Sequence, residues 1–222
     1  MKRQRTLTAC VALVAASVLV AGCGGDDEKS DKADEGKIAG TETSAPAKPS
    51  PTASEAAGEK DGPDLSLPKD LKVVSDWREP ADAEKAAALR GARNFVTGLL
   101  RGITRQDVDD PAYQYYSYPA SSARSQAKAN IQLHIDHGQS VTGTRRLHKE
   151  SVQVIRKHET AVVSFCVDDH DYNGKKVKTG EIVDSGTSEN AYGKYELGMV
   201  STNGSHWVAK ELKANSGDAE CA

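Results

Sequence analysis

Two histidines in the middle of the chain have a spacing that could contribute to a metal site. His134 and His137 are three residues apart on a predicted helix, with Asp136 between them, so they could share one face. A metal ion would need a third ligand, for which Asp168 and His170 are candidates, and the pair lacks the i, i+4 spacing of the HExxH motif. Imidazoles also favour the negative end of a helix dipole, so a polar helix end is the simpler explanation. We expect no metal site and no bound cofactor.

Three carboxylates and an imidazole lie together in residues 168–171, which read Asp-Asp-His-Asp. Such a set could bind a cation or act as acid and base. It also follows an apolar run and precedes Asn173-Gly174, a strong signal for a tight hairpin turn. We therefore expect a solvated hairpin end here, with a cation site or an acid–base pair as the alternative.

Four tyrosines cluster at Tyr113, Tyr115, Tyr116 and Tyr118. Tyrosine rings can cover the open end of a sheet while their hydroxyls reach water, so packing is the first interpretation. A small-molecule pocket and catalysis are the alternatives. The sequence has no nucleophile elbow with a Ser-His-Asp order, no Walker loop and no GxGxxG motif, and we expect no catalytic residue.

Basic side chains gather between residues 145 and 158. They are Arg145, Arg146, His148, Lys149, Arg156, Lys157 and His158. No aromatic residue interleaves them, so nucleic-acid binding is not indicated, and the formal net charge of −3 for the whole chain agrees. We expect a solvated sheet edge that its charge keeps from pairing with other strands. An anionic envelope or partner surface is the alternative.

The first half of the folded part reads as helical. Apolar residues recur at spacings of three and four between Leu89 and Ile103, which predicts a long helix over 81–104. A further helix is expected over 122–137, ended by Gly138.

The second half changes to the period of strands. Residues 152–155 begin a strand, 157–159 form a turn, and 161–167 are the most apolar stretch and should be a central strand. Asn173-Gly174 and Asn203-Gly204 are expected to be hairpin turns. Helices followed by an antiparallel meander predict an α+β fold, with the N-terminal helices packed on the sheet.

The N-terminus reads as an export signal. Lys2, Arg3 and Arg5 precede an apolar run of about 14 residues, which is short for a membrane span of about 20 residues. The small residues before Cys23, in Val20-Ala21-Gly22-Cys23, resemble the lipobox of bacterial lipoproteins. The resemblance implies cleavage of residues 1–22 and a diacylglyceryl thioether at Cys23, and two acyl chains hold a membrane firmly. An ordinary signal peptide or a buried helix is the alternative.

Residues 23–70 are expected to form the lipidated cysteine and a disordered tether, followed by a folded domain at 71–222. Between Gly24 and Asp64 there are eleven acidic residues, five lysines and no aromatic residue. Such a segment cannot bury enough apolar area to offset the entropy lost on ordering. All eleven aromatic residues of the chain lie at or after Trp77, so only the C-terminal part can build a core.

The four cysteines leave one candidate pair. Cys10 would leave with the signal peptide and Cys23 would carry lipid. An exported chain meets an oxidising environment, so Cys166 and Cys221 permit one disulfide that would fasten the C-terminal tail to the sheet. The alternative, a reactive cysteine, has no second cysteine at CxxC spacing.

The order of elements resembles the nuclear-transport-factor-like fold, also called the SnoaL-like or cystatin-like cone, as it occurs in actinobacterial-type lipoproteins. The resemblance is carried by the helix at 81–104, the Asp-Pro break at 110–111, the strand that holds Cys166 and the final strand of Trp207. It implies N-terminal helices packed on a curved antiparallel sheet.

The fold hosts isomerases, dehydratases, ligand binders and interaction domains, so it does not select a function. We expect a non-catalytic ligand- or protein-binding module, anchored through Cys23 to the outer face of the bacterial cytoplasmic membrane. Its partner would be an unknown envelope protein or a small ligand, and not nucleic acid. The alternative is a small isomerase- or dehydratase-like enzyme, with a pocket between helix and sheet that uses Tyr115, His134 or Asp136 as acid or base.

Overall fold

The computed structural model describes residues 62–183 and 191–222. The expected signal peptide, the lipobox with Cys23 and most of the tether lie outside the described residues, so these assignments stay predictions. Within the described ranges, no helix is long and apolar enough to cross a membrane.

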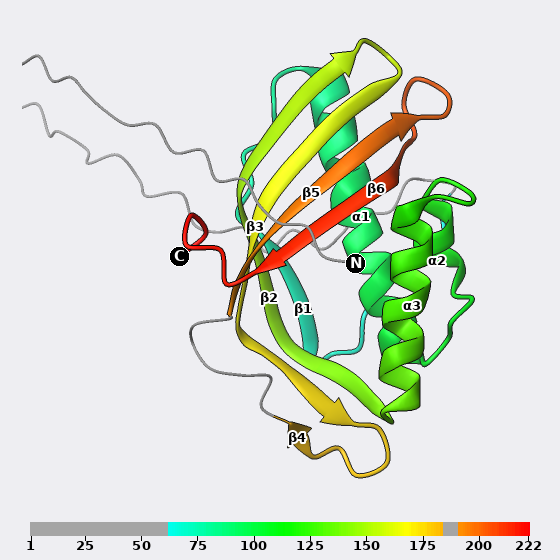
Figure 1. Cartoon of the computed structure of the whole chain (residues 1–222), viewed down its shortest axis with the longest axis vertical. Helices are drawn as coiled ribbons and strands as arrows, with labels where there is room; N and C mark the ends of the chain where they lie inside the picture. The colour runs from blue at the N-terminus through cyan, green and yellow to red at the C-terminus, as the bar shows by residue number, and fades with distance from the viewer. Residues whose placement is uncertain (1–61, 184–190) are drawn as a thin grey trace, which may run out of the picture. The chain divides into compact units, whose positions relative to one another are not determined.

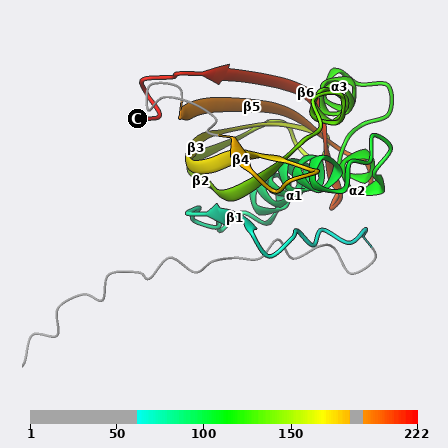
Figure 2. The same cartoon turned by 90° about the horizontal axis from the view of Figure 1, so that it is seen from below.

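Three helices and six strands make up the described part of the chain. In chain order they are β1 (Leu71–Ser75), α1 (Ala83–Arg105), α2 (Pro111–Tyr115), α3 (Ser122–Asp136), β2 (Gln139–Arg156), β3 (Thr160–Lys176), β4 (Ile182–Val183), β5 (Tyr192–Ser201) and β6 (Trp207–Ser216). The helices lie on one face of a curved sheet (Figures 1 and 2), which confirms the expected α+β class.

The sheet runs in the order β1–β2–β3–β5–β6, and the short β4 pairs with β3. β1 is parallel to β2, whereas the other pairs are antiparallel. The expectation of a wholly antiparallel sheet was therefore wrong at one edge, where a strand of five residues is too short to show a clear period. The solvated edge expected at the start of the basic segment was also wrong, because β1 and β3 flank β2 over residues 143–147.

Helix α1 begins and ends close to the predicted range. The Asp82 carboxylate caps it by accepting a hydrogen bond from the Lys85 amide at 2.9 Å. Gly91 lets the helix approach the sheet closely, because a Cβ at this position would lie 2.3 Å from the Trp207 carbonyl oxygen. Helix α3 likewise confirms the helix predicted over 122–137, with Ser121 as its N-cap.

The two Asn-Gly signals had different outcomes. Asn203-Gly204 does form the turn between β5 and β6, with a positive φ of 84° at Gly204. Asn173-Gly174 does not form a turn, because β3 continues to Lys176 and pairs these residues with Thr142 and Val141 of β2. A Cβ at Gly174 would lie 3.3 Å from the Val183 carbonyl oxygen, so this glycine serves the close approach of β4.

Both ends of the described chain are fastened to the domain. Leu65 is buried in the core, and the Asp64 carboxylate pairs with Arg101 and Arg105, so packing begins before residue 71. At the other end the expected Cys166–Cys221 disulfide is confirmed.

Candidate functional site

His134, one of the predicted metal ligands, makes its side-chain contact within its own helix, and His137 is the C-cap residue of that helix. His134 Nδ1 lies 2.9 Å from the Asn130 carbonyl oxygen, and the Asp136 carboxylate accepts a hydrogen bond from Gln132 at 2.8 Å. Among the residues that the structure describes, no group of histidine, cysteine, aspartate and glutamate side chains could hold a metal ion.

Tyr115 and His134, the two pocket candidates, are not brought together. Tyr115 ends α2, and its ring lies 4.5 Å from the His206 ring. Helix α2 is joined to the first turn of α3, where Arg124 donates a hydrogen bond to the Gln114 carbonyl oxygen. His134 follows ten residues later in α3, so the rise of the helix places it about 15 Å farther along the axis. Tyr115 therefore lies in the helix joined to the first turn of α3, whereas His134 lies in the last turn of α3.

A β-bulge sits where the sequence predicted a solvated hairpin end, which corrects that expectation. Between the pairs Thr144–Asp171 and Arg146–Asp168, β3 holds two residues and β2 only one. Asp168 uses one carboxylate oxygen to accept from the His170 amide at 3.0 Å and to contact His170 Nδ1 at 2.7 Å. The acidic cluster is thus divided, and Asp169 takes part in a different set of contacts.

Asp169 forms a two-point ion pair with Arg145 on β2. Arg145 donates from Nε to Asp169 Oδ1 at 2.8 Å and from Nη2 to Oδ2 at 2.7 Å. This fork geometry is the strong form of an arginine–carboxylate pair. Arg145 is only 8% exposed, whereas the side chain of Asp169 is 26% exposed.

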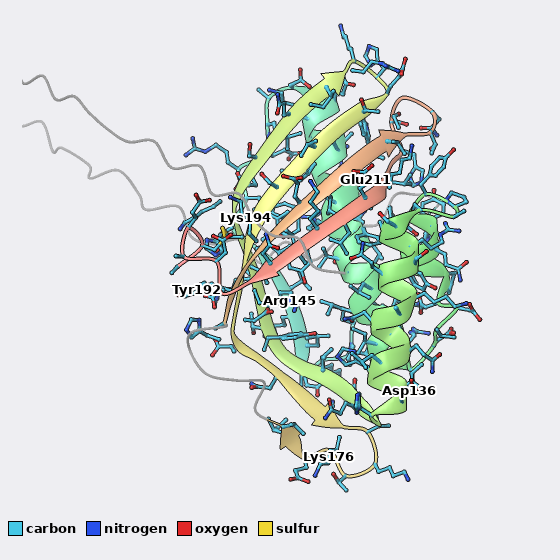
Figure 3. The ribbon with its side chains drawn as sticks, in the orientation of Figure 1. Asp136, Arg145, Lys176, Tyr192, Lys194 and Glu211 are labelled. Carbon is cyan, nitrogen blue, oxygen red and sulfur yellow. A yellow bond between two sulfur atoms is a disulfide. The ribbon has the colours of Figure 1, made fainter. Side chains whose placement is uncertain are left out.

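Arg145 lies on the face of the sheet that carries the helices. It pairs with Val73, which packs against the core, and precedes the fully buried Leu147 by two residues. The Tyr172 ring lies 4.1 Å from the guanidinium carbon. Figure 3 labels Arg145 in the part of the sheet where β1 and β2 run side by side.

Two tyrosines complete the group. Tyr172 and Tyr195 are partly buried and both pack against the core, and the Tyr195 ring stacks on Phe165 at 5.5 Å. We refer to Arg145, Asp169, Tyr172 and Tyr195 as the Arg145 site.

The environment fixes the protonation of this site. Burial is the main cause that raises the pKa of Tyr172 to about 12, and the neighbouring Asp169 adds to it. Burial alone would lower the pKa of Arg145, but Tyr172 and Asp169 outweigh it and hold that pKa well above its usual range. At neutral pH Tyr172 is uncharged, so Asp169 supplies the negative charge. Arg145 and Tyr172 are consequently hydrogen-bond donors rather than bases.

Sequence reasoning did not find the Arg145 site. Arg145 and Asp169 are 24 residues apart and meet only through the pairing of β2 with β3 and its bulge. Each residue lies in a run of like charges that is ordinarily solvated, so no local pattern marks the pair. The available signals were the basic run that begins at Arg145 and the acidic run at residues 168–171, each of which lies next to a predicted strand.

A comparison with known proteins finds no family model and no curated relative that matches the chain. Among solved structures, a ketosteroid isomerase-like protein from Erwinia carotovora atroseptica is 12% identical, with a TM-score of 0.41, and the match covers 61% of this chain and 97% of that one. A protein named as a candidate ketosteroid isomerase from Shewanella frigidimarina is also 12% identical, with a TM-score of 0.34 and coverage of 60% and 97%. Likeness at this level does not extend to activity.

Proposed function

We propose that this chain is a lipid-anchored binding domain on the outer face of the bacterial cytoplasmic membrane, and that it holds a small molecule at the Arg145 site without catalysis. The observation that carries the proposal is the forked Arg145–Asp169 pair beside Tyr172 on the core face of the sheet.

The fold itself gives little reason to keep this ion pair. Replacing a buried ion pair by apolar residues of similar volume is often neutral or stabilising, because desolvation offsets the attraction between the charges. The pair also coincides with a bulge in β3, and bulges are frequent beside binding sites, where they redirect a side chain. A role in recognition accounts for both features.

The remaining donors indicate the chemistry of the ligand. Nε and Nη2 of Arg145 are used by Asp169, and Nη1 has no hydrogen-bond partner among the described residues. A carboxylate bound there would lie close to Asp169 and be repelled, so a neutral carbonyl or amide oxygen fits better. The rings of Tyr172 and Tyr195 offer an apolar surface beside it. We therefore propose a small, uncharged carbonyl or amide compound with an apolar body.

Catalysis is the weaker interpretation because the acid–base candidates do not converge. Tyr115 lies in α2, which is joined to the first turn of α3, whereas His134 lies in the last turn of α3. The Asp136 carboxylate accepts a hydrogen bond from Gln132 within α3. At the Arg145 site, Tyr172 stays protonated up to high pH, which suits a donor that orients a ligand.

Native mass spectrometry of the secreted mature chain tests ligand binding. We expect a co-purifying mass on the wild-type chain that is lost in Arg145→Met. The matched control is Arg146→Met, because Arg146 is exposed and lies on the opposite face of the same strand. An adduct that survives Arg145→Met, or a wild-type chain that stays empty and shows no thermal shift with a panel of neutral amides and ketones, would overturn the proposal.

The anchor is tested separately. We expect palmitate labelling of the full chain in cells, with loss of label and release from the membrane fraction in Cys23→Ser. Cys10→Ser is the control, because that residue would be removed with the signal peptide. Label that persists in Cys23→Ser would contradict lipid attachment at this residue.

A further inference from the structure

The hairpin that joins β3 to β4 exposes two aliphatic side chains. Its turn is closed by a hydrogen bond from the Lys176 amide to the Glu181 carbonyl oxygen at 2.8 Å. Val177 is 48% exposed and Ile182 is 54% exposed. Ile182 lies in β4 and pairs with Lys175 of β3, and Val177 is the first residue of the turn that follows Lys176, so the two exposed aliphatic side chains belong to one short hairpin.

Lysines surround this aliphatic pair. Residues 174–183 contain Lys175, Lys176 and Lys178 against a single acidic residue, Glu181. Lys176 pairs with Glu181 within the hairpin, and Lys175 pairs with Asp70. Lys178 is exposed and makes no ion pair within the described ranges. Aliphatic side chains at a tip with ammonium groups beside them match the acyl boundary and phosphates of an anionic bilayer.

The tether leaves the domain at the same end as this hairpin. Asp64, near the first described residue, pairs with Arg105 in the last turn of α1. The next residue, Gln106, donates a hydrogen bond at 2.9 Å to the carbonyl oxygen of Gln139, which pairs with Lys176 at the base of the hairpin. Figure 1 shows β4 at one end of the sheet and the β2–β3 turn at the other.

We propose that the β3–β4 hairpin contacts the anionic phospholipid surface to which the chain is tethered. The biological setting rests on the proposed lipid anchor, whereas the contact itself depends only on the hairpin. The sequence between Cys23 and Asp64 has about 40 residues, and a chain of that length and composition is expected to span about 35 Å, which would keep the hairpin near the bilayer. Attachment then makes a weak contact effectively intramolecular.

Tryptophan reporters at the two ends of the sheet test the contact. The mature chain carries a histidine tag in place of Cys23 and is attached to vesicles that contain a nickel-chelating lipid, so attachment does not require natural lipidation. Val177→Trp is compared with Ile155→Trp, because Ile155 is 60% exposed in the β2–β3 hairpin, which also carries basic residues. We expect brominated phosphatidylglycerol to quench the tryptophan at 177 and not the one at 155, after subtraction of the wild-type signal. Equal quenching at both positions, or none at 177, would overturn the inference.

Binding of the untagged, unlipidated chain to phosphatidylglycerol vesicles separates the contribution of charge from the contribution of apolar burial. We expect Lys178→Gln, which removes one positive charge, to weaken binding about fivefold, as for one basic residue near an anionic surface. Replacing Val177 and Ile182 by serine should weaken it about tenfold through lost apolar burial, and Ile155→Ser should change it less than twofold. If neither hairpin variant differs from Ile155→Ser, the contact does not exist.

The two proposals fail independently. Quenching at 177 with an unlipidated Cys23 in cells would overturn only the anchor. A lipidated Cys23 with no quenching at 177 would overturn only the hairpin contact.

Discussion

Whether the Arg145–Asp169 pair serves binding or folding can be decided by a double-mutant cycle. Removing one partner of a buried ion pair costs about 3–5 kcal/mol, because the other charge stays desolvated. The side chain of Asp169 is 26% exposed, so Arg145→Met should lower the free energy of unfolding by less than this, about 2–3 kcal/mol. Asp169→Leu leaves the guanidinium of Arg145, a residue only 8% exposed, without its partner. This substitution should lower the free energy of unfolding by about 3–4 kcal/mol. The double variant should lie within about 1 kcal/mol of the wild type, since apolar side chains then replace both charges.

The assay is urea unfolding of the secreted, disulfide-intact chain, followed by tryptophan fluorescence and far-ultraviolet circular dichroism. Coincident transitions establish two-state behaviour, and a constant slope in urea allows the free energies to be compared. The double variant should also lack the co-purifying ligand while it regains stability. A double variant that loses as much as the two single variants together would show that the pair is needed for folding, and it would remove the main support for the Arg145 site.

Three further predictions test the stability of the domain. Replacing Cys166 and Cys221 by alanine opens a loop with a sequence separation of 55 residues, so the free energy of unfolding should fall by about 4 kcal/mol and Tm, measured by calorimetry, by about 8–16 °C. An unchanged Tm would contradict the loop-entropy estimate. Gly91→Ala places a Cβ against the Trp207 carbonyl oxygen, and a loss of about 1–3 kcal/mol in urea unfolding is expected, whereas a gain would show that α1 can shift. Burial lowers the pKa of His148, so as the pH falls this histidine is protonated in the unfolded chain before it is protonated in the folded chain. The urea midpoint of the wild type should therefore fall as the pH drops below about 6.5, and the midpoint of His148→Gln should fall less.

The elements with strong local signals were predictable. The three- and four-residue apolar spacing located α1, and Asn203-Gly204 located the β5–β6 turn, because periodicity and turn chemistry act within a few residues. The disulfide followed from the count of cysteines that the expected signal peptide and lipobox leave over. β1 was missed because its five residues become a strand only by pairing in parallel with β2.

The Arg145 site was not predictable because it depends on contacts between distant residues. The sequence places Asp169 in an acidic run, and its neighbour Asp168 does make the local contacts expected of such a run. Only the extra residue in β3 brings Asp169 opposite Arg145. Tyr115 and His134 were candidates because the family resemblance implies a pocket, yet the length of α3 separates them.

One feature of the sheet underlies both the Arg145 site and the hairpin contact. The pairing of β3 with residues 139–144 of β2 continues through Asn173-Gly174, where local turn chemistry predicted a stop. Because β3 continues, Tyr172 is held beside Arg145, and the hairpin that carries Val177 extends beyond it. A turn at Asn173-Gly174 would end β3 at Tyr172 and remove the base of the hairpin from the sheet. The tertiary pairing that overrides this turn signal therefore positions the two surfaces to which we assign binding.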